Sequence, residues 1–531
     1  MTDRSFWAWG RISDEPTSAS LAETANSLSE RYGRQILPVE QPSQSNLNLR
    51  SPRVEVPANL RGITSTDDAD RAVHTYGRSF PDRFRAFKGM FPAPPDAVLR
   101  PESEDQIEWI FEWAAANEVK VYPFGGGSSV VSGFEPDPDD ARVISLDMER
   151  FDKVLEVDTQ SRAARIQAGI YGPALERELK KHGLTMRHFP QSFEFSTLGG
   201  WIATRSGGHY ATNHTHIDDF VESARMLTPA GPWESRRLPG SGAGPSPDRM
   251  VLGSEGIFGV ITEAWVRLQA PPGFRASAGV YFDNYEDAWG AAREIGQAKL
   301  WPANLRMLDA VEGKNAAGMD GTKTLLVIGF ESSDVPQTES LATTLTMARE
   351  LGGIVDPDEV VDSEVTSSGA GRQGAVGRWR ESFINAPYAM NSTIALGLIH
   401  DTFETAVTWD AWPALDAEVR ASVQRVLDDR CGGGTISCRF THVYPDGPAP
   451  YYTFIAPGFS GGELETWGEI KEAASRAIIK SGGTITHHHA VGKLHRPWYD
   501  QQRPDLFERS LVAMKGVLDP AGIMSPGVLI D

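Results

Sequence analysis

The chain has 531 residues, of which 40% are hydrophobic and 23% charged, and its formal net charge at pH 7 is −20. A single hydrophobic core stops growing near roughly 250 to 300 residues, so we expect at least two domains. The negative charge argues against nucleic-acid binding, which needs a basic face. No apolar run approaches the roughly 20 residues needed to cross a bilayer, so we expect no transmembrane segment.

No recognisable targeting signal is seen at either end. Residues 1–34 lack a basic segment followed by an apolar core, and the last residues, Leu529 to Asp531, match no peroxisomal or lipidation signal. We therefore expect a cytoplasmic protein. Its two cysteines, Cys431 and Cys438, cannot form a disulfide framework or close a structural zinc site. Redox chemistry in this chain would need a cofactor.

The first 89 residues are polar and contain proline and serine clusters, and we expect an extension, partly helical, without a chemical role. Ser103 and Gln106 then form a capping-box signature ahead of apolar residues at helical spacing, which predicts an amphipathic helix. Alternating patterns predict strands at 119–122, 143–146, 154–157, 163–168 and 260–268, and a helix between Pro173 and Gly183. Residues 90–272 are therefore expected to form an α+β domain.

Three glycine-rich stretches interrupt this domain, at 123–129, 196–210 and 253–259. The first directly follows a strand, and its glycines favour a backbone whose amides point at one anion, such as a diphosphate. It is no P-loop, because no Gly-Lys-Ser/Thr follows, and no Rossmann turn, because Val130 replaces the third glycine. Each stretch alone is equally explained as a tight turn; together they favour a bound cofactor.

Three long helical patterns alternate with short strands between residues 273 and 480, which predicts a separate cap domain. Residues 481–531 are expected to return to the active site with His487, His488 and His489. On a strand, neighbouring side chains point to opposite faces, so only His487 and His489 could share a metal ion. We therefore predict no metal site.

The motifs resemble those of a known flavoenzyme family. Pro-x-Gly-Gly-Gly-x-Ser at 123–129, Phe-Ser-Thr-Leu-Gly-Gly-Trp at 195–201 and Gly-Ser-Glu-Gly-x-x-Gly-Val-Ile-Thr at 253–262 are similar to the vanillyl-alcohol oxidase type of FAD-binding domain. From about residue 90 to the C-terminus, their order and spacing most closely resemble the alkyldihydroxyacetonephosphate synthase family. The resemblance implies a two-subdomain FAD-binding domain, an α/β cap that binds a small or lipid-like substrate, and non-covalent FAD.

The resemblance also implies which residues line FAD: Pro123, Phe124, Gly125, Gly126, Gly127, Ser128, Ser129, Gln191, Ser192, Phe193, Glu194, Phe195, Ser196, Thr197, Thr204, Arg205, Ser206, Gly207, Glu255, Gly256, Ile257, Phe258, Gly259, Val260 and Ile261.

Six further residues match family positions at the catalytic centre. Tyr451 matches a tyrosine that serves as an acid or base, which requires its pKa of roughly 10 to be lowered by neighbours. The run 487–489 would polarise substrate or stabilise charge on the flavin. Arg306 and Arg439 match positions near the site, and each is equally explained by a structural ion pair.

One position departs from the family pattern. Counting back from Phe403-Glu404-Thr405, the arginine expected to hold the substrate falls at Met390. Methionine cannot pair with an anionic head group, so either another cation takes over or the substrate is less charged.

The resemblance implies exchange of an acyl for an alkyl group on dihydroxyacetone phosphate through an adduct at flavin N5. The main alternative is an FAD-linked oxidase or dehydrogenase of an alcohol or hydroxy acid, favoured if Met390 marks a lost anchor. Gly458-Phe459-Ser460-Gly461-Gly462 also fits a nucleophile elbow, although one helical pattern between Ser460 and His487 leaves little room for an acid-bearing strand. A non-catalytic flavin-binding protein is the other remote alternative, and a homodimer is left open.

Overall fold

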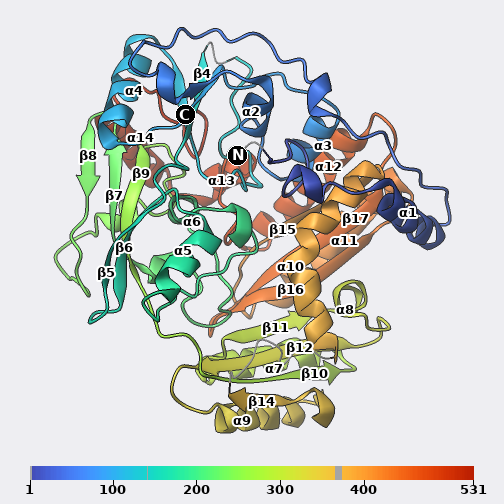
Figure 1. The fold of residues 1–531 in the computed structure, drawn as a ribbon. Coiled ribbons are helices and arrows are strands. Elements are labelled where there is room, and N and C mark those ends of the chain that lie inside the picture. The colour runs from blue at the N-terminus through green and yellow to red at the C-terminus, as the bar shows by residue number, and fades with distance from the viewer. Residues whose placement is uncertain (1–2, 140–141, 365–373) are drawn as a thin grey trace.

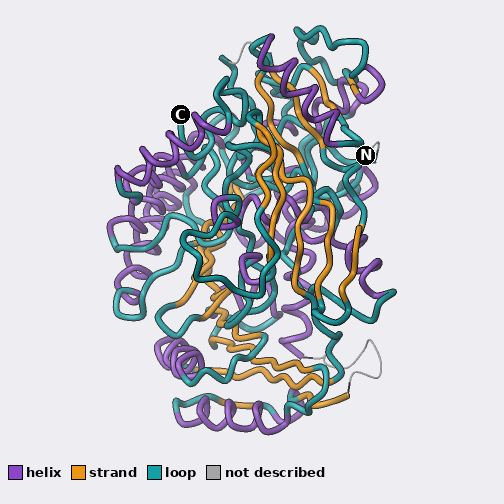
Figure 2. Tube along the Cα trace, turned by 90° about the vertical axis from the view of Figure 1, so that its left-hand side faces the viewer, coloured by secondary structure: helices purple, strands orange, loops and turns teal. Residues whose placement is uncertain are grey.

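The computed structural model describes residues 3–139, 142–364 and 374–531. In these ranges the chain forms three β-sheets with helices packed around them, which confirms the predicted α+β fold class (Figure 1). The strands run through the middle of the molecule and the helices lie mainly on its outside (Figure 2).

The smallest of these sheets carries the first glycine-rich loop. Its order is β1 (Thr64–Ser65), β2 (Ala97–Leu99), β4 (Val143–Asp147) and β3 (Lys120–Phe124), and β4 pairs in parallel with both β2 and β3. Parallel strands are covered on both faces, so their sequences are almost continuously apolar. All five residues of β4 are buried. Because β3 ends at Phe124, the chain enters the glycine loop directly from a rigid strand.

A five-stranded antiparallel sheet completes the FAD-binding half. Its order is β5 (Val154–Asp158), β6 (Ala163–Gln167), β9 (Val260–Arg267), β7 (Val221–Thr228) and β8 (Gly231–Glu234). In β9 the residues before Trp265 are mostly buried and the later ones alternate, as expected when one face of a sheet packs on a core. The third glycine-rich stretch leads straight into β9.

An eight-stranded antiparallel sheet forms the cap half. Its main path is β13 (Ile354–Val355), β10 (Phe274–Phe282), β12 (Thr324–Ser332), β11 (Asn304–Leu308), β16 (Thr435–Val443), β17 (Pro448–Pro457) and β15 (Leu398–Glu404), and β14 (Val361–Glu364) also pairs with β10. Arg439 pairs with Tyr451, and Tyr451 with Glu404, across the three adjacent strands at one end. This register gathers three polar residues at one place.

The helices are α1 (Ser18–Tyr32), α2 (Asp68–Val73), α3 (Phe80–Phe87), α4 (Glu104–Ala116), α5 (Gly172–Lys180), α6 (Leu198–Thr204), α7 (Tyr285–Gln297), α8 (Ala310–Ala317), α9 (Thr338–Glu350), α10 (Gly374–Ala395), α11 (Trp412–Cys431), α12 (Glu463–Lys480), α13 (Arg496–Gln502) and α14 (Asp505–Leu518). The three long patterns predicted in the cap are α10, α11 and α12. Ser103 caps α4 as predicted, accepting the Gln106 N–H, but Gln106 in turn accepts from Glu102 rather than closing the box.

The N-terminal residues, for which the sequence predicts only a partly helical extension, are part of the core. Phe6, Trp7 and Phe80 are at most 2% exposed and belong to the same apolar cluster as the cap sheet. Aromatic side chains bury large apolar areas, which holds this polar segment in place. The domain boundaries predicted near residues 90, 273 and 481 stay predictions.

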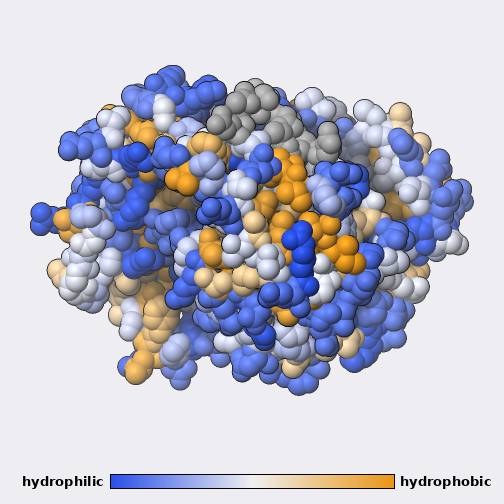
Figure 3. Space-filling model, turned by 90° about the horizontal axis from the view of Figure 1, so that it is seen from below, coloured by the Kyte–Doolittle hydropathy of each residue, from blue (hydrophilic) through white to orange (hydrophobic). Residues whose placement is uncertain are grey.

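Seen from below, the molecule shows apolar residues near the centre of its face with hydrophilic residues around them (Figure 3). Within the described ranges, no helix combines the length and apolarity required to cross a bilayer.

Candidate active site

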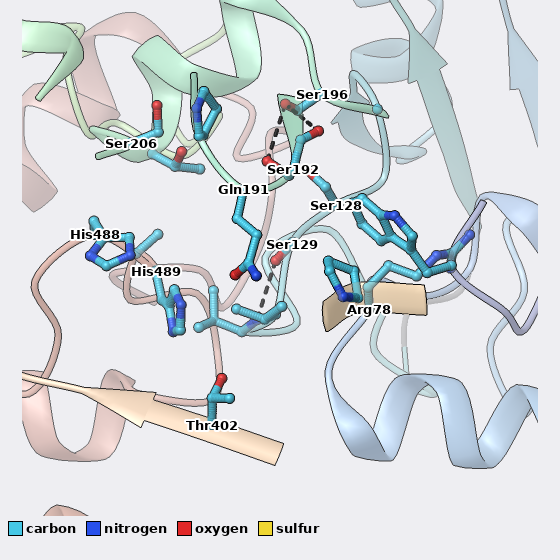
Figure 4. Close-up of a pocket in the computed structure, with 18 of the residues that line it drawn as sticks. Arg78, Ser128, Ser129, Gln191, Ser192, Ser196, Ser206, Thr402, His488 and His489 are labelled. Atoms are coloured by element: carbon cyan, nitrogen blue, oxygen red, sulfur yellow. Dashed lines mark hydrogen bonds between the residues drawn. The ribbon is translucent and has the colours of Figure 1, made fainter. Parts of the chain in front are cut away.

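A cavity of about 680 Å³ lies between the glycine-rich loops, the cap sheet and the N-terminal segment. Binding sites for cofactors and drug-sized ligands typically measure roughly 300 to 1,000 Å³. Figure 4 shows Gln191 reaching between Ser129 and the two histidines His488 and His489. The cavity is thus bordered by both predicted halves of the site.

The first glycine-rich loop has the geometry of an anion cradle. Gly127 has a φ of +68°, a conformation that glycine adopts without strain. Gly126 lies so close to the second loop that an added Cβ would stand 1.9 Å from the Phe195 carbonyl oxygen. In the described part of the chain, the N–H groups of Gly126, Gly127 and Ser128 donate to no protein group. Amides left free at a cavity wall fit a diphosphate, so the loop fits FAD.

Most of the predicted FAD residues line this cavity. They are Pro123, Phe124, Gly125, Gly126, Gly127, Ser128, Ser129, Gln191, Ser192, Ser196, Thr197, Thr204, Ser206, Gly207, Glu255, Gly256, Gly259, Val260 and Ile261. The others lie behind the wall or outside it: Phe193, Glu194, Phe195, Arg205, Ile257 and Phe258. Arg205, for example, forms an ion pair with Asp218 at 2.9 Å, and Phe258 is packed in the core.

The histidine run does not lie on a strand, so the strand expectation is wrong. Residues 487–489 form an irregular loop, and the side chains of His487 and His488 come together instead of diverging. Nδ1 of His487 lies 3.0 Å from Nδ1 of His488, and ligand atoms of His442, His487 and His488 lie within 4.8 Å of one another. This grouping has the residue types of a metal site, although the side chains already contact one another and Tyr444.

Glu404, at the end of β15, holds this loop in place. Its Oε1 accepts N–H bonds from His487, His488 and His489 at 2.8 to 2.9 Å. Its Oε2 lies 2.7 Å from Nδ1 of His488. Burial alone would raise the pKa of Glu404, but the neighbouring histidines hold it well below its ordinary value. An ionised carboxylate therefore fixes three consecutive histidines, two of which, His488 and His489, line the cavity.

Tyr451 lies on the cavity wall with its proton retained. Its hydroxyl donates to Thr402 Oγ1 at 3.0 Å, and the Arg439 guanidinium lies 4.2 Å from its ring centroid. Burial raises the pKa of Tyr451, and Arg439 only partly opposes this. The lowered pKa that action as a base would require is therefore not found, because burial outweighs one cation, and the hydroxyl is limited to donating its proton. Burial lowers the pKa of the neighbouring His489 to about 3, so that imidazole is neutral.

Arg306 and Arg439 both line the cavity but differ in their partners. Nη1 of Arg439 forms an ion pair with Glu312 at 2.8 Å. Among the described residues, the partners of Arg306 are neutral: it donates to Asn304 Oδ1 and to the His209 carbonyl oxygen. Burial, reinforced by Arg439, lowers the pKa of Arg306 to about 9. Arg439 thus forms an ion pair, as one of the two explanations supposed, and both arginines line the cavity. Their part in catalysis stays a prediction.

The N-terminal segment supplies site residues that the sequence analysis missed. Trp9, Arg78 and Arg83 line the cavity, and the Arg78 N–H donates to the Ser129 carbonyl oxygen (both residues are labelled in Figure 4). The sequence does contain a signal for the burial of Arg83. Phe80, Phe84 and Phe87 recur at helical spacing, and residue 83 lies on the same face of that helix. This pattern places an arginine on the buried side of a helix.

Ser460 lies away from this cavity. It is exposed at a second, smaller hollow, and no histidine is among the described residues that line it, whereas the histidine run borders the main cavity. This arrangement lacks the base that a serine nucleophile requires.

Two family models match the two halves of the chain. One, described as an FAD binding domain, matches residues 95–235, and the other, described as the C-terminal domain of FAD linked oxidases, matches residues 271–529. A solved p-cresol methylhydroxylase has the same fold, with a TM-score of 0.66 over 88% of this chain and 94% of that one at 13% identity. The fold and site therefore define an FAD-dependent enzyme.

Relatives at higher identity define the family. The alkyldihydroxyacetonephosphate synthase of Dictyostelium discoideum is 31% identical over 476 residues, covering 87% of this chain and 78% of the relative. A solved alkyldihydroxyacetonephosphate synthase shares the fold, with a TM-score of 0.79 over 99% of both chains at 24% identity. The chain belongs to the alkyldihydroxyacetonephosphate synthase family, and its cofactor is FAD.

Proposed function

We propose that this enzyme exchanges the acyl group of an acylated dihydroxyacetone phosphate for the alkyl group of a long-chain alcohol. The observation that carries the proposal is that one cavity joins the free amides of the glycine loop to Tyr451, His489 and buried arginines. Its cationic wall suits a phosphate-bearing lipid-like substrate, and the other part of the wall suits FAD. The cytoplasm stays the predicted compartment.

The exchange requires no oxidant. The bond between the substrate carbon and the acyl oxygen breaks, a bond to the alcohol oxygen forms, and the alcohol proton ends on the released fatty acid. Bound FAD would supply the isoalloxazine ring that activates this carbon. Tyr451, which keeps its proton at neutral pH, is placed to donate, and His489, which is neutral, is placed to accept. Glu404 orients the histidines for this proton transfer.

The test is turnover by the FAD-loaded protein. Purified enzyme receives palmitoyl-dihydroxyacetone phosphate and isotope-labelled hexadecanol, and mass spectrometry follows the alkylated product and free palmitate. We expect both in equal amounts, with the labelled oxygen of the alcohol retained in the ether. Palmitate without the ether would show hydrolysis and contradict the proposal.

Oxidation of an alcohol or hydroxy acid is the second candidate, and Met390 on the cavity wall is the observation that favours it. Under anaerobic conditions, a panel of these compounds would bleach the flavin absorption band if they are substrates. Bleaching together with absent ether formation would replace the first proposal by the second.

A further inference from the structure

Arg83 is an arginine buried in the wall of the cavity. It is 1% exposed on α3, and within the described ranges it forms no ion pair with a carboxylate. Nη1 donates to the Pro387 carbonyl oxygen at 3.4 Å and Nη2 to Oδ1 of Asn391, while Nε has no partner. The guanidinium therefore has an unused N–H donor and an uncompensated charge.

Another arginine of α3 has the carboxylate partners that Arg83 lacks. Arg85, on the same helix, pairs with Glu135 at 2.5 Å and with Asp82 at 3.1 Å. Asp401 is the carboxylate that most affects Arg83, but its Oδ2 already accepts from the Trp467 indole at 2.7 Å. Leaving one charge buried without a partner costs several kcal/mol. A ligand anion would remove that cost.

The position of Arg83 points to the substrate. Its two partners lie on α10 on either side of Met390, and both Met390 and Arg83 line the cavity. The helix that carries Arg83 also packs against β15, where Thr402 accepts the hydroxyl of Tyr451. The unpaired charge of Arg83 is therefore on the cap side of the cavity, near Tyr451, the proposed proton donor.

A different cation borders the glycine loop that would hold the FAD diphosphate. The backbone N–H of Arg78 donates to the Ser129 carbonyl oxygen at 2.6 Å, which fixes Arg78 at the glycine loop. Its guanidinium donates to the carbonyl oxygens of Gly77 and Ser5 and keeps Nε free. Arg78 and Arg83 thus both line the cavity, Arg78 bonded to the glycine loop and Arg83 to α10.

We infer that Arg83 binds the phosphate group of the substrate and replaces, from α3, the cation that is missing at Met390 on α10. The inference rests on the proposed function. It makes Arg83 a substrate-binding residue: the guanidinium holds the head group beside Tyr451, and the acyl chain extends into the rest of the cavity.

The test measures binding of an unreactive phosphate monoester, glycerol 3-phosphate, to the FAD-loaded enzyme by isothermal titration calorimetry. Removing one partner of a buried charge pair typically weakens binding by about 30-fold or more, and we expect this for Arg83→Met. Arg83→Met combined with Met390→Arg should recover at least about ten-fold, because a cation returns to the same wall. Arg85→Gln, on the same helix but ion-paired, should change the dissociation constant by less than about two-fold.

The same variants separate this inference from the proposed function. Flavin absorbance after desalting should stay at the wild-type value in Arg83→Met, and loss of FAD would assign Arg83 to the cofactor and overturn the inference. An unchanged dissociation constant would also overturn it, while ether synthesis by the wild-type enzyme would leave the proposed function standing. If Arg83→Met does not fold, the same binding measurement is made on Arg83→Lys and on the double variant, since both keep a cation at this wall of the cavity. A wild-type enzyme that binds lactate but no glycerol 3-phosphate would contradict both the proposed function and the role of Arg83.

Discussion

Nδ1 of His488 lies 2.7 Å from Oε2 of Glu404, the residue whose other carboxylate oxygen accepts the N–H groups of three consecutive histidines. One buried carboxylate therefore determines both the backbone path of the loop and the orientation of an imidazole at the cavity. A charge at the end of β15 thus acts on the site through the histidines.

Replacing Glu404 by glutamine should disable the site without releasing FAD. Glutamine keeps an acceptor for the backbone amides but lacks the negative charge that faces Nδ1 of His488. Misplacement of catalytic groups by about 1 Å costs on the order of 100-fold in rate, which we expect for the ether-forming activity. Glu418→Gln, which breaks a surface pair with Lys480, is the control and should keep the wild-type rate. Full activity in Glu404→Gln would contradict the assigned role.

Tyr451→Phe should abolish turnover and leave FAD bound. Loss of a general acid typically costs about 10²- to 10⁴-fold in rate, whereas one hydroxyl on the cap side adds little to flavin binding. Tyr452→Phe is a matched control because its hydroxyl donates to Asp416 at 2.9 Å, away from the cavity. It should lower stability and preserve turnover. Steady-state rates and flavin spectra measure both, and an active Tyr451→Phe enzyme would remove this tyrosine from the mechanism.

Gly126→Ala should destroy the cofactor cradle. Its Cβ would stand 1.9 Å from the Phe195 carbonyl oxygen, so one of the two loops must move. We expect purified protein with little FAD, measured as the ratio of flavin to protein absorbance after desalting. Gly468→Ala in α12 meets nothing within 4 Å and serves as control. That variant should keep its FAD and gain roughly 0.5 to 1 kcal/mol of stability. A Gly126→Ala protein with full flavin content would contradict the cradle geometry.

Arg439 and Glu312 should behave as one unit in unfolding experiments. Their side chains are 8% and 6% exposed, so Arg439→Gln or Glu312→Gln alone leaves a buried charge and should cost about 3 to 5 kcal/mol. The double variant should cost much less than the sum of the two single variants. Urea unfolding of all four proteins measures this coupling. Additive losses would show that the pair contributes nothing beyond its separate side chains.

Acidification should destabilise the protein from about pH 6.5 downward. Burial lowers the pKa of His188, His400 and His489 to about 3 from an ordinary value of 6.5. Between these values the unfolded chain binds protons that the folded chain does not, so stability is present above pH 6.5 and lost as the pH falls. Each histidine should cost on the order of 1 kcal/mol per pH unit. Urea midpoints measured at several pH values between 8 and 5 check this expectation, and a constant midpoint would refute it.

Much of the fold could be predicted because its signals are local. The sequences of β3, β4 and β9 alternate or run apolar between glycine and proline residues, and the structure contains these strands almost as predicted. The path of residues 487–489 could not be predicted, because it depends on Glu404, which is remote in sequence. The raised pKa of Tyr451 depends likewise on complete burial, which tertiary packing alone decides. The burial of Arg83 could have been predicted from the aromatic residues at helical spacing around it.

The strand β3 has consequences for how the enzyme is made. One edge of β3 pairs with β4, while at the other edge the Val121 N–H donates to the Ile523 carbonyl oxygen and the Ser525 N–H to that of Val121. The strand that carries the first glycine loop is therefore completed by residues 523–525, which are remote from it in sequence. The loop is expected to become rigid only after these two distant parts of the chain have come together, so the FAD site should form late in folding.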